Sequence, residues 1–370
     1  MKGCCVFNYN PLYRYPIYNE IGKQLGMDIY LGDNVFEPLE QFDVNKLTGF
    51  KRMLHAKRIL NGRFVYHSGI WPLFSKGYDT YIVSADSTLI VVWLLLFYGK
   101  IFKKRVFLWG HGLKKKIQRP LTRVVYKLFY RSAAGVFLYN NYNVKNMLDI
   151  GCKKEKMFVI HNSLDYAKQL ELRQTMIETD IFRNHFKNEK KNLIFIGRLT
   201  KVKKLNILLE SLAILKQRGE LFNLTFIGDG SEGELLKKMT VDLSIENQTW
   251  FLGACYDERK NAELIFNADL CVSPGNIGLT AMHSLMFGCP TLTNDDFETQ
   301  MPEFEAIIAG KTGGFFKAYE PEDLANCIRD WFNTHSANRE EVRSDCYKEI
   351  DSNWNPSFQM QVIHKALFIN

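Results

Sequence analysis

The chain of 370 residues is longer than one hydrophobic core usually organises, so we expect two domains of ordinary size. Its composition is 46% hydrophobic and 24% charged with no low-complexity tract, which excludes disordered and fibrous classes. The net charge of +8 is divided unevenly, because residues 1–165 hold 25 Lys and Arg against 11 Asp and Glu, a net charge of +14. The remaining residues carry a net charge of −6, so the first half is the basic half.

Basic residues of the first half gather in two runs, KIFKKR (100–105) and KKKIQR (114–119), and continue at helical spacing beyond them. Apolar residues are interleaved with this continuation: Leu121, Val124, Val125, Leu128 and Phe129. The combination favours an anionic membrane surface as a partner, with a solvated helix face as the alternative. No motif that reads RNA or DNA accompanies the charges, so we expect no nucleic-acid partner.

The longest apolar run, TLIVVWLLLFYG (88–99), is too short to span a bilayer and predicts a buried helix. The N-terminal MKGCCVFNYN enters a strand at once and lacks the build of a signal peptide. The eight Cys include no C-x-x-C pair and are interpreted as reduced core residues. We therefore expect a cytoplasmic protein, peripheral on the inner face of the plasma membrane.

Short apolar runs alternate with helical periodicity throughout the first half. The predicted strands are 4–7, 28–31, 64–67, 80–84, 106–109, 136–139 and 157–160. Helical stretches lie between them, near 16–25, 86–99, 118–132 and 141–149. This rhythm is typical of an α/β domain with a doubly wound parallel sheet.

A polar, charged segment follows, and residues 171–190 are predicted as the linker between domain 1–170 and domain 191–354. The rhythm then restarts, with strands predicted at 193–196, 224–227, 250–252, 270–273 and 291–293. Helices are predicted from Lys203, Glu232 and Glu258, near Thr280, and near 321–333 and 337–350. A C-terminal helix, 355–370, is expected to pack back on the first domain. Two Rossmann-like domains with parallel sheets would face each other across a cleft, where ligands bind beyond the carboxyl ends of the strands.

Two cations follow the first strand of the second domain, in the sequence LIFIGRLTKVKK. Arg198 comes directly after Gly197, and Lys203 lies at the mouth of a helix, whose N-terminus favours an anion. Arg offers a planar fork and Lys a point charge, so this pair suits a diphosphate. The alternative is a pair of solvated charges at a strand–helix turn.

Two glycine-rich segments follow later strands. In IGDGSEGELL, the G-x-G-x-x-G spacing lies in the second β–α step and no acidic residue ends the next strand, so a dinucleotide site is not favoured. We interpret Gly228 and Gly230 as positions where the backbone approaches a ligand. In SPGNIGLTAMHSLMFGCP, Gly275 and Gly278 precede an amphipathic helix whose backbone N–H groups would hold a phosphate.

The ordered set IGRLTKVKK, IGDGSEGELL, FLG, ADLCVSPGNIGLTAMHSLMFGCPTLT and EAIIAGKTGGFF resembles the donor-binding domain of the family-four retaining glycosyltransferases of GT-B fold, the glycosyl transferases group 1. The resemblance covers about residues 191–332. The first half is similar more loosely, through WGHG after a strand and through HNSLD, where the family often has N-G-V-D.

The resemblance implies that Arg198 and Lys203 grip the nucleotide diphosphate of a sugar donor and stabilise the leaving phosphate, so no metal or other cofactor is expected. His111 in WGHG matches a His beside the donor sugar, with a buried structural His as the alternative. The implied donor-binding residues are Gly197, Gly228, Gly230, Gly275, Asn276, Ile277, Gly278, Leu279, His283, Glu303 and Glu305.

The loop after the first strand holds Asn10, Tyr13 and Arg14, and the resemblance places it at the cleft rim, near donor and acceptor. A plain turn before a Pro-opened helix would look the same.

The family's E-x7-E motif is absent from this chain. Alignment on the shared Gly288 before Pro puts the two Glu positions at Gly275 and His283. A neutral His283 can still hydrogen-bond a ribose hydroxyl. Because position 275 has no carboxylate, we expect another glutamate to bind the donor sugar. The candidates are Glu298, Glu303 and Glu305, the last of which matches the family's Pro-Glu position.

We therefore expect a metal-independent hexosyltransferase that moves a sugar from a nucleotide diphosphate to a glycan acceptor, lipid-linked, in surface polysaccharide or glycoconjugate biosynthesis. One alternative is a nucleotide-sugar epimerase on the same architecture, which needs no acceptor. Another is a catalytically silent nucleotide-binding GT-B protein, which the missing carboxylates suggest. Product formed from donor alone would indicate the first alternative, and nucleotide binding without turnover the second.

Overall fold

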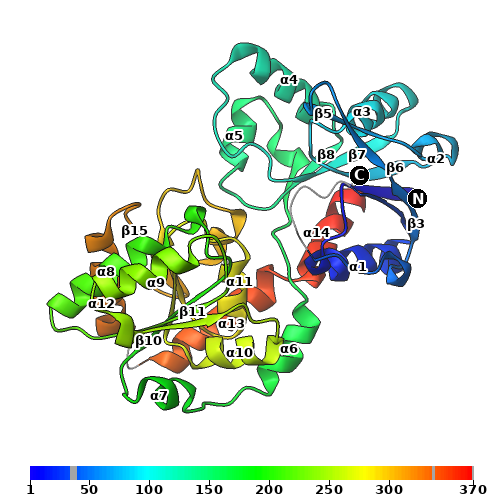
Figure 1. Cartoon of the computed structure of the whole chain (residues 1–370). Helices are drawn as coiled ribbons and strands as arrows, with labels where there is room; N and C mark the ends of the chain where they lie inside the picture. Colours follow the sequence, from blue (N-terminus) through cyan, green and yellow to red (C-terminus); the bar gives the residue numbers. More distant parts are fainter. Residues whose placement is uncertain (34–39, 336–337, 369–370) are drawn as a thin grey trace. The chain divides into compact units, whose positions relative to one another are not determined.

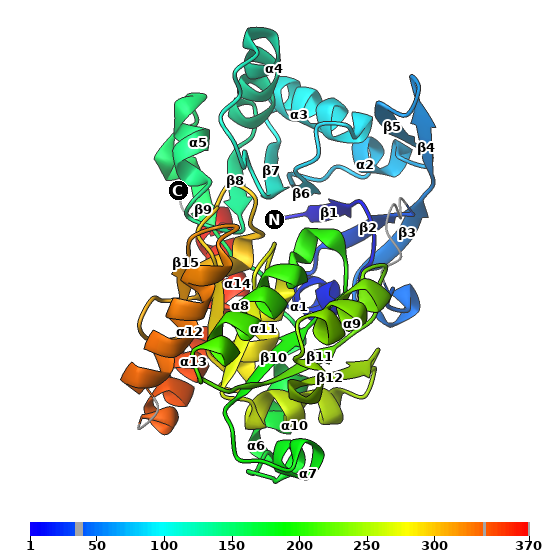
Figure 2. The same ribbon diagram turned by 60° about the vertical axis from the view of Figure 1, so that its left-hand side comes forward.

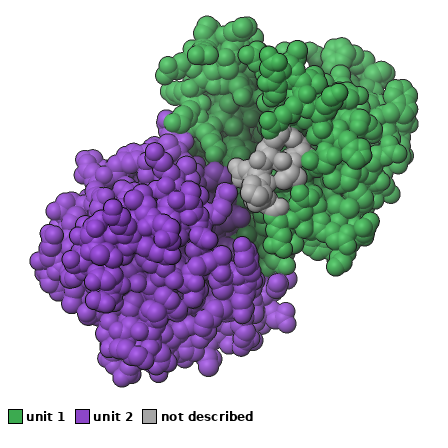
Figure 3. All heavy atoms as spheres, in the orientation of Figure 1, with its two compact units in different colours: residues 1–165, 355–370 green, residues 166–354 purple. Residues whose placement is uncertain are grey.

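The computed structural model describes residues 1–33, 40–335 and 338–368, and the chain divides into two compact units (Figures 1 and 3). Unit 1 contains Met1–Asp165 and Asn355–Asn370, and unit 2 contains Tyr166–Trp354. Each unit has its own parallel sheet with helices on both faces, which is the α/β, GT-B class expected from the sequence. Residues 337 and 369–370, which two predicted helices include, lie outside the described residues.

The sheet of unit 1 has seven parallel strands in the order β3-β2-β1-β6-β7-β8-β9. Their bounds are β1 (Gly3–Phe7), β2 (Asp28–Gly32), β3 (Phe50–Leu54), β6 (Thr80–Ser84), β7 (Arg105–Gly110), β8 (Gly135–Leu138) and β9 (Met157–Val159). The order of connection reverses between β1 and β6, and in such sheets ligands bind beyond the carboxyl ends of the strands at this point.

Helices cover both faces of this sheet. On one face, α1 (Tyr15–Leu25) contacts α14 (Pro356–Phe368), the C-terminal helix. Arg105 at the start of β7 donates hydrogen bonds to the carbonyl oxygens of Leu367 (2.6 Å) and Ala366 (2.9 Å), so α14 is tied to the sheet. The other helices of unit 1 are α2 (Trp71–Ser75), α3 (Ile90–Phe102), α4 (Pro120–Arg131) and α5 (Val144–Asp149), and α3 lies beside α4 in both ribbon views (Figures 1 and 2).

The sheet of unit 2 has six parallel strands in the order β12-β11-β10-β13-β14-β15. Their bounds are β10 (Asn192–Ile196), β11 (Asn223–Ile227), β12 (Thr249–Gly253), β13 (Leu270–Ser273), β14 (Thr291–Asn294) and β15 (Gly313–Phe316). The connection order reverses between β10 and β13, so the carboxyl ends of these two strands mark the expected ligand position.

The helices of unit 2 form two groups. On one face, α8 (Leu205–Gln217) contacts both α9 (Gly233–Asp242) and α12 (Pro321–His335). On the other, α11 (Leu279–Met286) contacts α10 (Glu258–Asn267) and α13 (Arg339–Asn353). The segment 171–190, predicted as a linker, holds the end of α6 (Tyr166–Gln174) and all of α7 (Ile181–Phe186), and both helices contact α10. This segment therefore belongs to unit 2.

The strand predicted at 64–67 is confirmed as β5 (Phe64–His67), but it does not join the parallel sheet. It pairs antiparallel with β4 (Ala56–Ile59) in a separate ribbon, because a turn with positive φ at Leu60, Asn61 and Gly62 joins them. The apolar run predicted as a buried helix forms α3, which buries only one face. Its other face is exposed and includes Leu94, Phe97, Ile101 and Phe102. No helix in the described ranges is long and apolar enough to cross a membrane.

Candidate active site

Three neighbouring strands of unit 2 end at one edge of the sheet: β11, β10 and β13. The segments that follow them carry Gly228, Arg198 and Gly275 respectively. The first two segments are linked through their backbones, since the Gly197 N–H donates to the carbonyl of Ile227 at 2.9 Å. The parallel sheet thus gathers three predicted site segments that lie far apart in the sequence.

Glycine is required at these positions because the backbone segments touch. A Cβ atom on Gly228 would stand 1.9 Å from the carbonyl oxygen of Gly197, and one on Gly230 would stand 2.4 Å from that of Leu199. A Cβ atom on Gly275 would stand 2.2 Å from the Val202 carbonyl oxygen. The space beside Gly228 and Gly230 is therefore filled by protein backbone. This packing accounts for glycine at 228 and 230, and the approach of a ligand to their backbone stays a prediction.

The turn at 274–278 is held rigidly by buried amide side chains. The Gln300 Nε2 donates to the carbonyl of Gly275 at 3.2 Å, while its Oε1 accepts from the Ile277 N–H at 2.9 Å. Asn294 Nδ2 donates to the carbonyls of Pro274 (2.8 Å) and Gly275 (3.1 Å). Buried amides with several hydrogen bonds fix one loop conformation, so the start of α11 is preorganised.

The sequence predicted that free backbone N–H groups at the start of this helix would hold a phosphate, and two N–H groups of the preceding turn are bonded within the protein. The Asn276 N–H donates to the carbonyl of Val202 at 3.2 Å, and the Ile277 N–H donates to Gln300. Gly278 follows with φ 57° and ψ −147°, a conformation almost restricted to glycine. No side chain of the described residues caps α11, whose first-turn amides lack intrahelical acceptors. The amides of 278–280 are thus the ones placed to meet an anion.

The two predicted cations differ in exposure. Arg198 is exposed, whereas Lys203 is partly buried and its Nζ donates to the Asn276 carbonyl at 2.5 Å. Burial, together with the nearby charge of Arg198, lowers the pKa of Lys203 to about 8, and the charge of Glu303 partly opposes this shift. The two cations therefore lie close enough to repel each other, which a bound anion would relieve.

The three candidate glutamates lie in different surroundings. Glu303, in a 3-10 turn (Pro302–Ala306) that packs on α11, is only 2% exposed and acts electrostatically on Lys203. Glu305 in the same turn is half-buried, and Glu298 is exposed. Of the three, Glu303 is the one that the structure places beside the predicted phosphate grip.

His283 lies in the second turn of α11 and faces α6. Its Nδ1 is 3.3 Å from the Gln169 Nε2, and burial lowers its pKa while the charge of Glu258 opposes this shift. The neutral ring keeps one donor and one acceptor. Its predicted contact with a ribose hydroxyl stays a prediction, and Gln169 is the partner that the sequence did not indicate.

Four predicted residues belong to unit 1. Asn10 is buried and its Nδ2 donates to the carbonyl of Phe42 at 2.7 Å, while Tyr13 is half-buried. Arg14, predicted at a rim, is instead only 5% exposed, because three aromatic rings cover its guanidinium. Burial lowers the pKa of His111 to about 3, with Lys114 and Arg14 adding to the shift, so its ring is neutral at pH 7.

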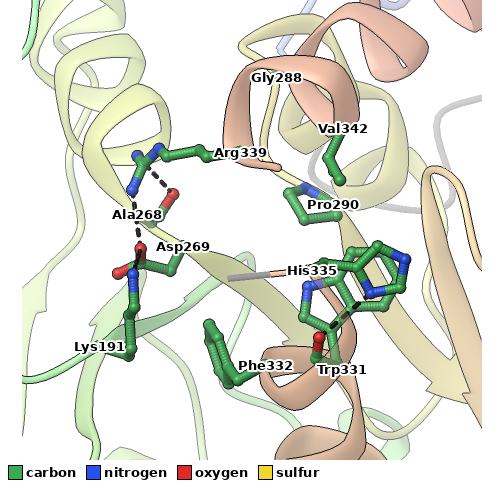
Figure 4. Close-up of a pocket in the computed structure, with 10 residues that line it drawn as sticks. All are labelled: Lys191, Ala268, Asp269, Gly288, Pro290, Trp331, Phe332, His335, Arg339 and Val342. Carbon is green, nitrogen blue, oxygen red and sulfur yellow. Dashed lines mark hydrogen bonds and ion pairs between the residues drawn. The ribbon is translucent and has the colours of Figure 1, made fainter. Parts of the chain in front are cut away.

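A small cavity of about 30 Å³ lies at the opposite, amino-terminal edge of the unit 2 sheet (Figure 4). Asp269, which precedes β13, pairs there with Arg339 at 2.7 Å and Lys191 at 3.3 Å. Arg339 also donates to the carbonyl of Phe266, so these bonds fasten α13 to the sheet. The cavity has room for about one water molecule and is not a substrate site. Within the described ranges, no cluster of His, Cys, Asp or Glu could hold a metal ion.

The structure adds residues that the sequence did not single out. Gln300 and Asn294 hold the glycine turn, and Thr280 Oγ1 donates to the carbonyl of Ile196 at 2.8 Å, which joins α11 to the end of β10. Trp109 and Tyr139 cover Arg14 in unit 1. The sequence carried no signal for the amides, although Trp109 directly precedes the GHG segment.

Comparisons with known proteins agree with this arrangement. Residues 176–349 match the model of the family described as glycosyl transferases group 1. A Klebsiella pneumoniae protein, described as an uncharacterized 41.2 kDa protein in the cps region, is 24% identical over 245 residues. That match covers 65% of this chain and spans only 61% of the Klebsiella protein.

Solved structures share the fold over the whole chain. Anabaena Alr3699/HepE in complex with UDP is 16% identical, with 99% of each chain covered and a TM-score of 0.71. The lipopolysaccharide outer core galactosyltransferase WaaB is 14% identical, with a TM-score of 0.72. The match covers 100% of this chain and 99% of the WaaB chain. A glycosyltransferase from Rickettsia africae is 13% identical over 100% of both chains, with a TM-score of 0.73.

Proposed function

Because residues 176–349 match the model of the glycosyl transferases group 1 family, we propose that this chain transfers a sugar from a nucleotide diphosphate to a glycan acceptor with retention of anomeric configuration. The observation that carries the proposal is the edge of unit 2, where Arg198, Lys203 and the first turn of α11 meet on a backbone packed through glycines. Two cations and a helix N-terminus form a site for a diphosphate.

The proposed chemistry breaks the bond between the sugar's anomeric carbon and the diphosphate oxygen. The acceptor oxygen bonds to the same carbon on the same face, and the acceptor's proton passes to the released diphosphate. Arg198 and Lys203 stabilise the charge that develops on the leaving oxygen, so we propose that the reaction needs no metal. A transition-state role of this kind lowers kcat when either cation is removed.

Gly275 explains why the family carboxylate is missing at this position. A Cβ atom there would stand 2.5 Å from the Lys203 carbonyl carbon, so a glutamate cannot enter without displacing the lysine segment. We propose that Glu303 binds the donor sugar instead, since it is buried against α11 and acts on Lys203. A uridine diphosphate sugar is the first donor to test, because HepE of the same fold was crystallised with UDP and with UDP-glucose.

A lipid-linked acceptor at an anionic membrane is supported by unit 1. Residues 87–148 contain 12 Lys and Arg and no Asp or Glu. Within this stretch α3 exposes Phe97 and α4 exposes Leu121 and Leu128, beside basic residues of both helices. An apolar groove of about 580 Å³ adjoins α3 and is lined by Trp71, Phe97 and Ile101, among others. Exposed apolar side chains among cations suit an interface of acyl chains and anionic headgroups. The neighbour WaaB and the cps-region relative support a place in surface polysaccharide biosynthesis.

A thermal unfolding panel of nucleotide diphosphates and nucleotide sugars, in the presence of a chelator, tests the donor site. A ligand at a hundred times its Kd stabilises the folded chain by about 2.7 kcal/mol. We expect one nucleotide to stabilise the wild type and the matched control Arg259→Ala, an exposed arginine of α10, but not Arg198→Ala. If no nucleotide in the panel stabilises the wild type, the donor site is refuted.

A turnover assay then separates the reaction classes. Nucleotide release that requires an added acceptor supports a transferase. A modified sugar nucleotide formed from donor alone would indicate an epimerase, and binding without any turnover would indicate a silent protein.

A further inference from the structure

Arg14 of unit 1 is a buried cation, and no carboxylate of the described residues forms an ion pair with it. Its side chain lies in the segment between β1 and α1 and is 5% exposed. The guanidinium carbon stands 4.8 Å from the ring centre of Tyr139, 5.1 Å from that of Tyr13 and 5.7 Å from that of Trp109. Within residues 1–33, 40–335 and 338–368, Nη1 has no hydrogen-bond partner, and the Tyr13 hydroxyl is the side-chain group bonded to the guanidinium.

Two more nitrogen atoms near Arg14 are buried without a partner among the described residues. They are Nε1 of Trp109, whose side chain is 4% exposed, and Nδ1 of His111. The His111 ring lies 4.9 Å from that of Tyr139, the residue that also covers Arg14. Trp109 Nε1 can only donate, and a neutral His111 can donate from Nδ1.

Such a cluster is unfavourable unless something occupies it. Arg remains charged throughout the accessible pH range, and cation–π contacts only partly replace the water that burial removes. Buried donors are normally satisfied, so three unsatisfied nitrogen groups in one place require an explanation. An oxyanion bound to the Arg14 guanidinium would neutralise its charge, and Trp109 and His111 supply further donors beside the same group of rings.

The position of the cluster in the sheet is the one that ligands use. Arg14 follows β1, Trp109 and His111 lie at the end of β7, and Tyr139 follows β8. These are carboxyl ends of strands on both sides of the point where the connection order reverses, between β1 and β6.

We propose that Arg14, Trp109 and His111 form a site for an oxyanion of the acceptor, either the phosphate that joins a glycan to its lipid or the carboxylate of an acidic sugar. The inference rests on the proposed function for the identity of the acceptor. All residues of this site belong to unit 1, and those of the donor phosphate grip belong to unit 2.

The test uses the full chain with Arg198→Ala, which removes the Arg198 contact to a donor phosphate. Thermal unfolding is followed while sodium pyrophosphate or sodium glucuronate is added at constant ionic strength. We expect one probe to raise the unfolding temperature saturably. Adding Arg14→Met should weaken its apparent affinity at least tenfold, and adding Trp109→Phe, which keeps the ring but removes the donor, about threefold. Adding Arg63→Met, an exposed arginine of unit 1, is the matched control and should change nothing.

The outcomes separate the sources and the alternatives. A preference for pyrophosphate indicates a lipid phosphate, and a preference for glucuronate indicates an acidic sugar. Without a probe, Arg14→Met should unfold at the same or a higher temperature, since an uncompensated buried charge is removed. Three outcomes would overturn the proposal. The first is an equal response of Arg14→Met and Arg63→Met, and the second is no response to either probe. The third is a lower unfolding temperature of Arg14→Met together with an unaltered response of Trp109→Phe. Nucleotide binding by chains with Arg198 intact is measured separately. A failure of the proposed donor site can therefore be distinguished from a failure of the proposed acceptor site.

Discussion

Lys203 in unit 2 and Arg14 in unit 1 are both cations beyond the carboxyl ends of central strands, yet their surroundings have little in common. Lys203 donates a hydrogen bond to a backbone carbonyl. Burial and the charge of Arg198 lower its pKa to about 8 against the opposing charge of Glu303, so its protonation changes near neutral pH. Arg14 is covered by aromatic rings and has a fixed charge.

The difference implies that the two proposed anion sites would bind their ligands through different chemical groups. In unit 2 the proposed site depends on the backbone, because glycines allow its segments to pack closely and the start of α11 supplies amide donors. In unit 1 the side chains Arg14, Trp109 and His111 supply the donors. Substitutions should therefore affect unit 2 through its backbone and unit 1 through its side chains.

The largest expected effect is at Gly275, where the backbone of unit 2 is most crowded. Gly275→Ala places a methyl group against backbone atoms of Val202 and Lys203 and should lower the free energy of unfolding by about 3 kcal/mol. The matched Gly253→Ala has positive φ but meets no atom within 4 Å, so it should cost only about 1 kcal/mol. Urea unfolding curves measure both, and equal destabilisation would show that the packing argument is wrong.

Removal of the exposed cation of the grip should affect ligand binding more than folding. Arg198→Ala should weaken nucleotide diphosphate binding roughly 10- to 100-fold, the usual worth of a charge-assisted hydrogen bond. Arg14→Met should reduce that binding less than Arg198→Ala does, because Arg14 is not one of the two cations proposed to bind the donor diphosphate. Calorimetric titration compares the two variants, and an equal reduction of affinity in both would erase the distinction between the two sites.

Lys203 makes nucleotide binding depend on pH in a way that Arg14 cannot. With a pKa of about 8 in the free protein, its charge is lost as the pH rises, so binding should weaken by up to about tenfold between pH 7 and pH 9. The free protein should instead gain stability from this group between pH 8 and its unfolded pKa of about 10.4, because the unfolded chain then binds more protons. Lys203→Arg keeps the charge and should remove both slopes. A slope that persists in this variant would assign it to another group.

The smallest expected effect concerns the apolar surface of unit 1. Phe97→Glu combined with Leu128→Glu should reduce cosedimentation with vesicles of anionic lipid several-fold, because each side chain is exposed and loses its favourable transfer into the interface. Leu235→Glu, exposed on α9 of unit 2, is the matched control. Unchanged cosedimentation of the double variant would remove the support for a membrane-facing surface.

The sequence predicted most of the fold because apolar runs and helical periodicity are local signals. It missed β3, where Lys51 and Arg52 are exposed at the sheet edge, and β15, which begins with two glycines. These two strands form because each pairs with an adjacent strand of the sheet, and the local sequence pattern does not reveal that pairing. The predicted cations and the glycine turn of unit 2 lie together as parallel β–α order requires.

What the sequence did not reveal depends on contacts between distant segments. Gly228 meets Gly197, Gln300 holds Gly275, and Arg14 lies beneath Trp109, and each contact exists only once the sheet has formed. A glycine that admits a ligand and a glycine that admits backbone look alike in a sequence. The sequence likewise indicates that an arginine in a tyrosine-rich loop is exposed, and only the structure shows which aromatic rings cover it.

A crystal structure of the chain with UDP, grown with a chelator, tests the central claim most directly. We predict the β-phosphate within hydrogen-bond distance of Arg198 and Lys203 and of the backbone amides at 278–280, with Asn276 and Ile277 still bonded within the protein. A β-phosphate bound away from Arg198 and Lys203, or one held through a metal ion, would contradict the account.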